Sequence, residues 1–178
     1  MRLSWLFAKY LPVGRQTGSP SNSYRFRASG DNAGVIPVDQ VLCSPCTEQG
    51  RCRLGLKNAR FDADTVSMEL DVECDDANSG AEGIAHGGWT ASILDDACGF
   101  LMLYADRWNV TKNLDVRFLR PIPINRPLIV RSRLVEHMGD RWRIAGEVVL
   151  ADTGIKLASA SGIFVEPAEG HFERAAEL

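Results

Sequence analysis

The chain has 178 residues, of which 45% are hydrophobic and 24% are charged, which suits one domain with a sizeable core or a domain plus an arm. This composition excludes a disordered or collagen-like chain, and no window approaches about 18 uninterrupted apolar residues, so we expect no membrane-spanning helix. The net charge of −3 gives no general reason to expect nucleic-acid binding.

Residues 1–40 are predicted to form a flexible basic arm. The first 30 residues hold five basic residues and no acid, and residues 13–34 are rich in Gly, Ser, Pro and Asn, which is typical of a linker. Five cysteines, an odd number in a chain with no recognisable signal peptide, favour a reducing compartment. We therefore expect a cytoplasmic protein, with the mitochondrial matrix as the alternative if the arm is a transit peptide.

Three cysteines follow the arm: Cys43, Cys46 and Cys52 have the spacing C-x2-C-x5-C. A closed zinc site needs four ligands, so a metal here would require a distant fourth ligand such as Cys74 or a histidine. Three reduced thiols near a domain edge are the favoured interpretation, and we expect no metal.

Five later stretches alternate apolar and polar residues with period two, which predicts half-buried strands. In the first of them, Val66, Met68, Leu70, Val72 and Cys74 face one way. In the second, Leu114, Val116 and Phe118 share one side. Short turn signals at residues 138–140 and 152–154 predict antiparallel hairpins between the last three. The predicted strands are residues 61–74, 111–119, 127–137, 141–151 and 155–165.

Residues 86–107 are predicted to form a helix, because their apolar residues recur at helical spacing on most sides, as in a buried helix. Trp89, Phe100, Met102 and Tyr104 could line a pocket on this helix, although we expect most of them to fill the core. One buried helix followed by a meander of strands predicts an α+β fold, with an antiparallel sheet of five to six strands wrapped around the helix. The edge strand and apolar surface left by such a sheet favour a dimer.

The segment that enters this helix contains His86, Gly87 and Gly88. The first amides of a helix lack internal partners and carry the positive end of its dipole, so they can hold a developing oxyanion. We expect the Gly87 N–H to be that donor. The alternative is that the two glycines serve only a tight turn. For His86 the favoured role is to hold this turn, and contact with a substrate is the alternative.

Two carboxylates, Asp95 and Asp96, lie in the middle of the apolar helix, where a charge is costly unless it is paired or used. Small neighbours around Asp95 leave room for a substrate, although both aspartates could instead face a solvated stripe. Because Gly87 and Asp95 are about 12 Å apart along the axis at 1.5 Å per residue, they cannot both reach one carbonyl from the same chain. If both act, they come from two subunits.

The sequence resembles the PaaI type of hotdog-fold acyl-CoA thioesterases over roughly residues 43–166. It contains no G-x-S-x-G elbow, no H-E-x-x-H and no P-loop. The strongest likeness is G-x-x-H-G-G followed by an aspartate nine positions after the histidine. The residues and runs that carry the resemblance are Gly83, His86, Gly87, Gly88 and Asp95, then residues 111–114, 118–121 and 160–165.

The resemblance implies a hotdog domain at residues 41–166, a short tail at 167–178, and hydrolysis of an acyl-CoA without a cofactor. Asp95 would act as general base or nucleophile, and the Gly87 N–H would polarise the thioester carbonyl. Thr111 would orient the water or the carboxylate, and His86 would place the carbonyl or the turn. The protein would be a homodimer or a dimer of dimers. The expected substrate contacts are Gly88, Asp96 and Asn113.

The chain departs from the family pattern at two positions. Many members have an asparagine six residues before the histidine, where this chain has Gly80, and relatives often have Asp-Glu where this chain has Asp95-Asp96. The alternative function is a non-catalytic acyl-CoA-binding or sensing protein, because fold alone does not establish catalysis. A hydratase on the same scaffold is a further option, with His86 of the partner subunit near the carboxylate.

Overall fold

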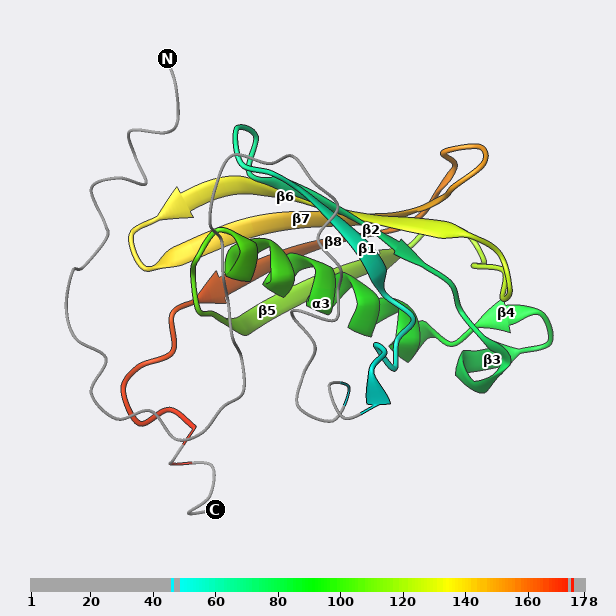
Figure 1. Ribbon diagram of the computed structural model, residues 1–178, viewed down its shortest axis with the longest axis horizontal. Helices are drawn as coiled ribbons and strands as arrows, with labels where there is room; N and C mark the ends of the chain where they lie inside the picture. Colours follow the sequence, from blue (N-terminus) through cyan, green and yellow to red (C-terminus); the bar gives the residue numbers. More distant parts are fainter. Residues whose placement is uncertain (1–45, 47–48, 173, 175–178) are drawn as a thin grey trace.

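Figure 1 shows the computed structural model, which describes residue 46, residues 49–172 and residue 174. The predicted arm at 1–40 and Cys43 lie outside the described residues, as does part of the predicted tail at 173 and 175–178. Within the described part, no helix has the length and apolar character needed to cross a bilayer.

The main sheet has six strands, all paired antiparallel, in the order β1-β2-β6-β7-β8-β5. Its edges are therefore β1 and β5. A separate two-stranded sheet, preceded by a short 3-10 helix η2 (Asp76–Asn78), consists of β3 (Ser79–Ala81) and β4 (Ile84–Ala85). The strands of the main sheet are β1 (Lys57–Asp62), β2 (Ser67–Val72), β5 (Val110–Phe118), β6 (Leu128–Met138), β7 (Arg141–Leu150) and β8 (Lys156–Val165).

One long helix, α3 (Gly87–Tyr104), lies across one face of this sheet (Figure 1). Half of its residues are buried, including Ile93, Leu94 and Leu101, which are fully inaccessible. The inward residues of β2, β6, β7 and β8 meet it from the other side, so the core lies between helix and sheet. This arrangement confirms the expected α+β architecture of one buried helix wrapped by an antiparallel sheet.

The helix is shorter than the predicted range because both of its ends are capped. His86 is the N-cap residue, and its side chain accepts a hydrogen bond from the Gly88 N–H. At the other end, the Arg107 N–H bonds the Met102 carbonyl at 2.8 Å, and the Asp106 N–H bonds the Leu103 carbonyl at 3.0 Å. Asp106 adopts a left-handed backbone conformation with φ of 59°. This pair of bonds is the Schellman motif, which ends the helix.

The prediction of a single strand at 61–74 is wrong, because this stretch contains a hairpin turn. Residues 61–62 end β1, and β2 begins at Ser67. The Asp62 carboxylate accepts the N–H groups of Asp64 and Thr65 at 2.9 and 3.3 Å, which closes the turn. The predicted inward face is nevertheless confirmed for β2 and its flanks, since Val66, Met68, Leu70, Val72 and Cys74 are all buried.

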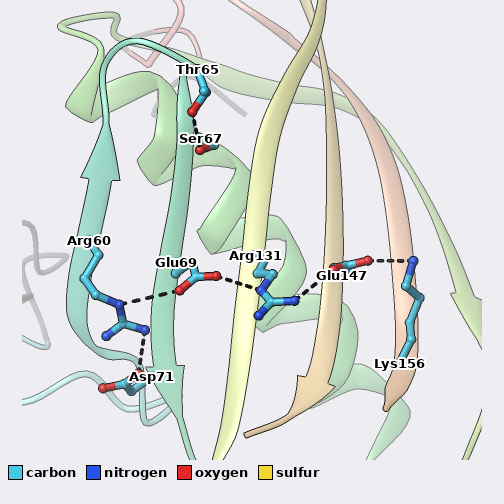
Figure 2. A network of polar contacts seen from close by, with 8 residues as sticks. All are labelled: Arg60, Thr65, Ser67, Glu69, Asp71, Arg131, Glu147 and Lys156. Atoms are coloured by element: carbon cyan, nitrogen blue, oxygen red, sulfur yellow. Dashed lines mark hydrogen bonds and ion pairs between the residues drawn. The ribbon is translucent and has the colours of Figure 1, made fainter. Parts of the chain in front are cut away.

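A network of ion pairs crosses the outer face of the sheet, on the side opposite α3 (Figure 2). Arg131 on β6 bonds Glu69 on β2 at 2.7 Å and approaches Glu147 on β7 at 3.6 Å, and Glu147 is 2.6 Å from Lys156 on β8. At the other end, Arg60 on β1 contacts Glu69 at 3.7 Å. Each exposed pair stabilises the fold only slightly, but together the pairs make this face of the sheet polar.

Candidate active site

The entry to α3 is held in place by His86. Its backbone N–H bonds the Asn78 carbonyl at 2.8 Å, and its Nδ1 accepts the Gly88 N–H at 2.9 Å. The capping bond requires an unprotonated Nδ1, which in a neutral imidazole leaves the proton on Nε2. The structural role predicted for His86 is therefore confirmed, while its contact with a substrate remains a prediction.

Gly80 fits this turn for a steric reason. A Cβ at position 80 would lie 2.8 Å from the His86 Cα, closer than real Cβ atoms come to backbone. The asparagine that many family members carry at this position would therefore require the turn around His86 to shift. The backbone around His86 therefore explains why this chain has glycine at position 80.

The first amide of the helix is available to a ligand. The Gly88 N–H is engaged by His86, whereas the Gly87 N–H has no acceptor among the described residues. An unpaired amide at a helix N-terminus attracts negative charge. The ring of Phe118, at the end of β5, lies 3.6 Å from where a Cβ of Gly87 would be. Phe118 lies on the helix side of β5, as its spacing predicts, but it is 61% exposed.

Asp95 is held by a hydroxyl from the edge strand. The Thr111 Oγ1 donates a hydrogen bond to the Asp95 Oδ1 at 2.8 Å. Thr111 faces the helix because it lies opposite the fully buried Phe164 of β8. The register shifts between Thr111 and Asn113, and Asn113 lies opposite Ile163, on the other face of the sheet. The structure therefore brings Asp95 and Thr111 together and places Asn113 away from them within the same chain.

A cavity of about 230 Å³ opens beside this pair. It contains both predicted carboxylates, Asp95 and Asp96, together with one cationic side chain, Arg53. Burial, together with the charge of Asp95, raises the pKa of Asp96 to about 6, although Arg53 acts against both. The lining residues are Cys46, Cys52, Arg53, Asp95, Asp96, Gly99, Phe100, Leu103, Trp108, Asn109, Val110 and Thr111.

Several of these lining residues were not found from the sequence. Arg53, Trp108 and Asn109 come from segments outside the strands and the helix, and no periodicity marks such positions. Among the aromatic and Met candidates on the helix, Trp89, Met102 and Tyr104 are buried, whereas Phe100 lines the cavity. The Trp89 indole N–H bonds the Leu54 carbonyl at 3.1 Å, which ties the segment carrying Arg53 to the helix.

Two of the predicted thiols belong to the cavity wall. Cys46 and Cys52 are both free, and the Cys46 sulfur accepts the Arg53 N–H at 3.4 Å. Cys74 and Cys98 are buried elsewhere in the core, where burial raises the pKa of the Cys74 thiol to about 11 and of the Cys98 thiol to about 12. These two buried thiols are poor nucleophiles near neutral pH.

Comparison with known proteins agrees with this geometry. Residues 82–155 match the family model of the thioesterase superfamily, a range that contains His86, Gly87, Asp95 and Thr111. The acyl-coenzyme A thioesterase THEM4 of Bos taurus is 29% identical over 87 residues, which are 49% of this chain and 35% of the bovine protein. The chain therefore spans about a third of the length of this curated relative.

Two solved structures share the fold at 27% identity. One is a thioesterase superfamily protein, with a TM-score of 0.58 over 64% of this chain and 54% of its own. The other is a phenylacetic acid degradation-related protein from Ralstonia eutropha JMP134, with a TM-score of 0.55 over 60% of this chain and 82% of its own. The described part of this chain has a hotdog fold, and its residues 82–155 are similar to the thioesterase superfamily.

Proposed function

We propose that the chain hydrolyses an acyl-CoA thioester to a free acid and CoA, with Asp95 as the reacting carboxylate. The observation that carries the proposal is the hydrogen bond between Thr111 and Asp95 at the cavity. Thr111 fixes one carboxylate oxygen and leaves the other to face a substrate. The bovine relative, which bears the name of an acyl-CoA thioesterase, supports the assignment of the substrate class.

Two routes use the same carboxylate. As a general base, Asp95 accepts a proton from water while the water oxygen attacks the carbonyl carbon, and the C–S bond then breaks to release the thiolate. As a nucleophile, Asp95 attacks the carbonyl itself and expels the thiolate, and water then hydrolyses the resulting anhydride. In both routes the thiolate takes up a proton, and the products are the same acid and thiol.

The oxyanion formed on the carbonyl needs a donor about 3 Å away. The Gly87 N–H is the best candidate, but it precedes Asp95 by eight residues on the same helix, about 12 Å along the axis. The donor therefore comes from a second copy of the chain. A dimer with two equivalent sites at a two-fold interface meets this requirement.

The edge strand β5 offers a way to form this dimer. Thr111, at its start, contacts Asp95, and Phe118, at its end, lies against Gly87. If two β5 strands pair antiparallel about Leu114, the middle residue of the strand, Thr111 lies opposite Arg117 of the partner subunit and next to the partner subunit's Phe118, across a strand spacing of about 5 Å. Gly87 of the partner subunit then lies beside the Asp95–Thr111 pair. The charged outer face of the sheet, by contrast, suits solvent.

The test is thiol release from acyl-CoA substrates of several acyl types. We expect Asp95→Asn to lower kcat by about 10²–10⁴, the usual contribution of a positioned base. Asp140→Asn, an exposed carboxylate in the turn between β6 and β7, is the matched control and should retain full activity. Full turnover by Asp95→Asn would refute the assignment. Tight acyl-CoA binding without hydrolysis would instead favour the non-catalytic binding protein.

A further inference from the structure

The cavity extends in one direction from the Asp95–Thr111 pair. It follows α3 from Asp95 to Leu103, eight residues that span about 12 Å. Its character changes along this path: Asp95, Asp96 and Arg53 lie near the reacting end, and Phe100, Leu103 and Trp108 line the rest. A thioester at Asp95 would therefore direct its acyl group toward Trp108.

The size of the cavity limits that acyl group. Its volume is about 230 Å³. The stretch along α3 from Asp95 to Leu103 is about 12 Å long. A straight saturated acyl group of six to eight carbons fills it. A longer acyl group must displace the side chain at the end of the cavity farthest from Asp95.

Trp108 closes that end from a loop that is firmly attached to the helix. The loop leaves α3 through the Schellman motif at Asp106. The Asn109 side-chain amide donates to the Gly99 carbonyl at 3.1 Å and to the Arg107 carbonyl at 3.3 Å. Arg107 also forms an ion pair with Glu166, just after β8, at 3.4 Å. These contacts hold the backbone of the loop, while the Trp108 side chain is 38% exposed.

A residue from the C-terminal segment supports the indole. After β8 the chain turns back, and the ring of Phe172 meets Trp108 edge to face, with centroids 6.1 Å apart and an interplanar angle of 65°. His171 meets the Phe172 ring at 5.1 Å in the same manner. Phe172 contacts Trp108 but does not line the cavity. It can influence an acyl group only through the position of the indole.

We propose that Trp108 is the end wall of the acyl cavity and sets a preference for acyl groups of six to eight carbons, with Phe172 as the positioning residue behind it. The proposal rests on the proposed thioesterase function. It assigns to Trp108 and Phe172 a role in substrate choice that the reacting carboxylate does not have. Replacing the wall should change which acyl group is accepted and leave the chemistry at Asp95 in place.

The experiment measures kcat/KM for saturated straight-chain acyl-CoAs of four to sixteen carbons. The wild-type chain should prefer six to eight carbons and lose at least tenfold at sixteen. Trp108→Ala should move the optimum to ten carbons or more. Trp108→Leu, which keeps an apolar side chain there, should give a smaller shift and serves as the second variant if Trp108→Ala fails to fold.

Phe172 and a surface control complete the set. Phe172→Ala should raise the ratio of dodecanoyl to hexanoyl kcat/KM about fivefold through KM, and Phe172→Tyr should restore the wild-type ratio. Val135→Ala removes a half-exposed apolar side chain from β6 and should change nothing. A length profile that stays the same in both Trp108 variants, or a wild-type optimum at fourteen or sixteen carbons, would overturn the proposal.

Binding measurements distinguish an error in the role proposed for Trp108 from an error in the proposed thioesterase function. Non-hydrolysable thioether analogues of the same acyl-CoAs, measured by calorimetry, report the length preference without turnover. If no acyl-CoA is hydrolysed but Trp108→Ala still extends the preferred length of the bound analogue, the wall is supported and the hydrolytic function is refuted. If hydrolysis occurs but the preferred acyl length does not depend on Trp108, the hydrolytic function is supported and the role of Trp108 as end wall is refuted.

Discussion

Replacing Gly87 by proline removes the proposed oxyanion donor with little disturbance of the helix. Gly87 is the first residue of α3, a position where proline is well tolerated because its missing N–H lacks an intrahelical partner in any case. His86 already has the extended conformation that a residue before proline requires, with φ of −67° and ψ of 137°. A Cβ at position 87 meets only the Phe118 ring, at an ordinary 3.6 Å.

Gly87→Ala is the matched control, since it adds the same Cβ and keeps the N–H. Loss of one oxyanion donor costs about 10²–10³ in kcat, or about 2.7–4 kcal/mol of transition-state stabilisation. We therefore expect Gly87→Pro to lose that factor in thiol release from hexanoyl-CoA, with thermal unfolding close to that of Gly87→Ala. A proline variant as active as the alanine variant would refute the role of this amide.

Mixed dimers that combine Gly87→Pro with a second variant show which chain supplies the amide. When Gly87→Pro and Asp95→Asn subunits associate, a site shared between two chains leaves one intact site in each heterodimer. A statistical mixture should then recover about a quarter of wild-type activity. A site formed within one chain leaves every site damaged, so activity no higher than that of the separate variants would refute the shared arrangement.

Three further predictions follow from individual contacts. Thr111→Val removes the hydroxyl that bonds Asp95 and should lower kcat by about 10- to 100-fold, the equivalent of about 1.5–3 kcal/mol for a bond to a charged group; Thr111→Ser should keep most activity in the same thiol-release assay. The pKa of Asp96 is raised to about 6 in the folded protein, so the folded state holds this proton more tightly than the unfolded state. The contribution of Asp96 to the free energy of unfolding therefore falls as pH rises from about 4 through 6. In urea unfolding, the free energy of unfolding of Asp96→Asn should rise relative to that of the wild type over this pH range, by at most about 3 kcal/mol. A difference between the two proteins that does not change with pH would contradict the burial of this carboxyl. Asp106 has a left-handed backbone conformation at the helix end, which glycine adopts without a steric penalty. Asp106→Gly should therefore raise the free energy of unfolding by about 0.5–1 kcal/mol. Asp106→Ala, which keeps a Cβ, should not raise it.

The sequence was sufficient for the regular parts of the fold. Period-two alternation located the last four strands to within a few residues, because each buries one face against the helix. The same signal failed at residues 61–74, where the alternation continues through a turn. The Asp-Ala-Asp-Thr run at residues 62–65 was the available sign of that turn, since a carboxylate there can accept the next backbone amides.

The candidate site was foreseen only where its residues follow a pattern. Asp95 stood out as a charge on an apolar helix, and its bond to Thr111 was anticipated from the resemblance. Arg53 and Trp108 were missed because both reach the cavity from irregular segments, which only the folded chain brings beside the helix. The resemblance predicts a substrate contact for Asn113, but the register shift between Thr111 and Asn113 turns Asn113 to the other face of the sheet.

The separation of the two catalytic groups along α3 has a physical rationale. A carboxylate at the start of its own helix would be stabilised by the dipole and by the free amides, and would occupy the place where an oxyanion must form. In the middle of the helix, Asp95 keeps its charge away from that end and is held by Thr111 instead. The Gly87 amide then remains open for the carbonyl oxygen of a substrate. In the proposed dimer, a two-fold axis near β5 would bring the amide of one helix to the carboxylate of the other, so association of two chains would assemble both sites at once.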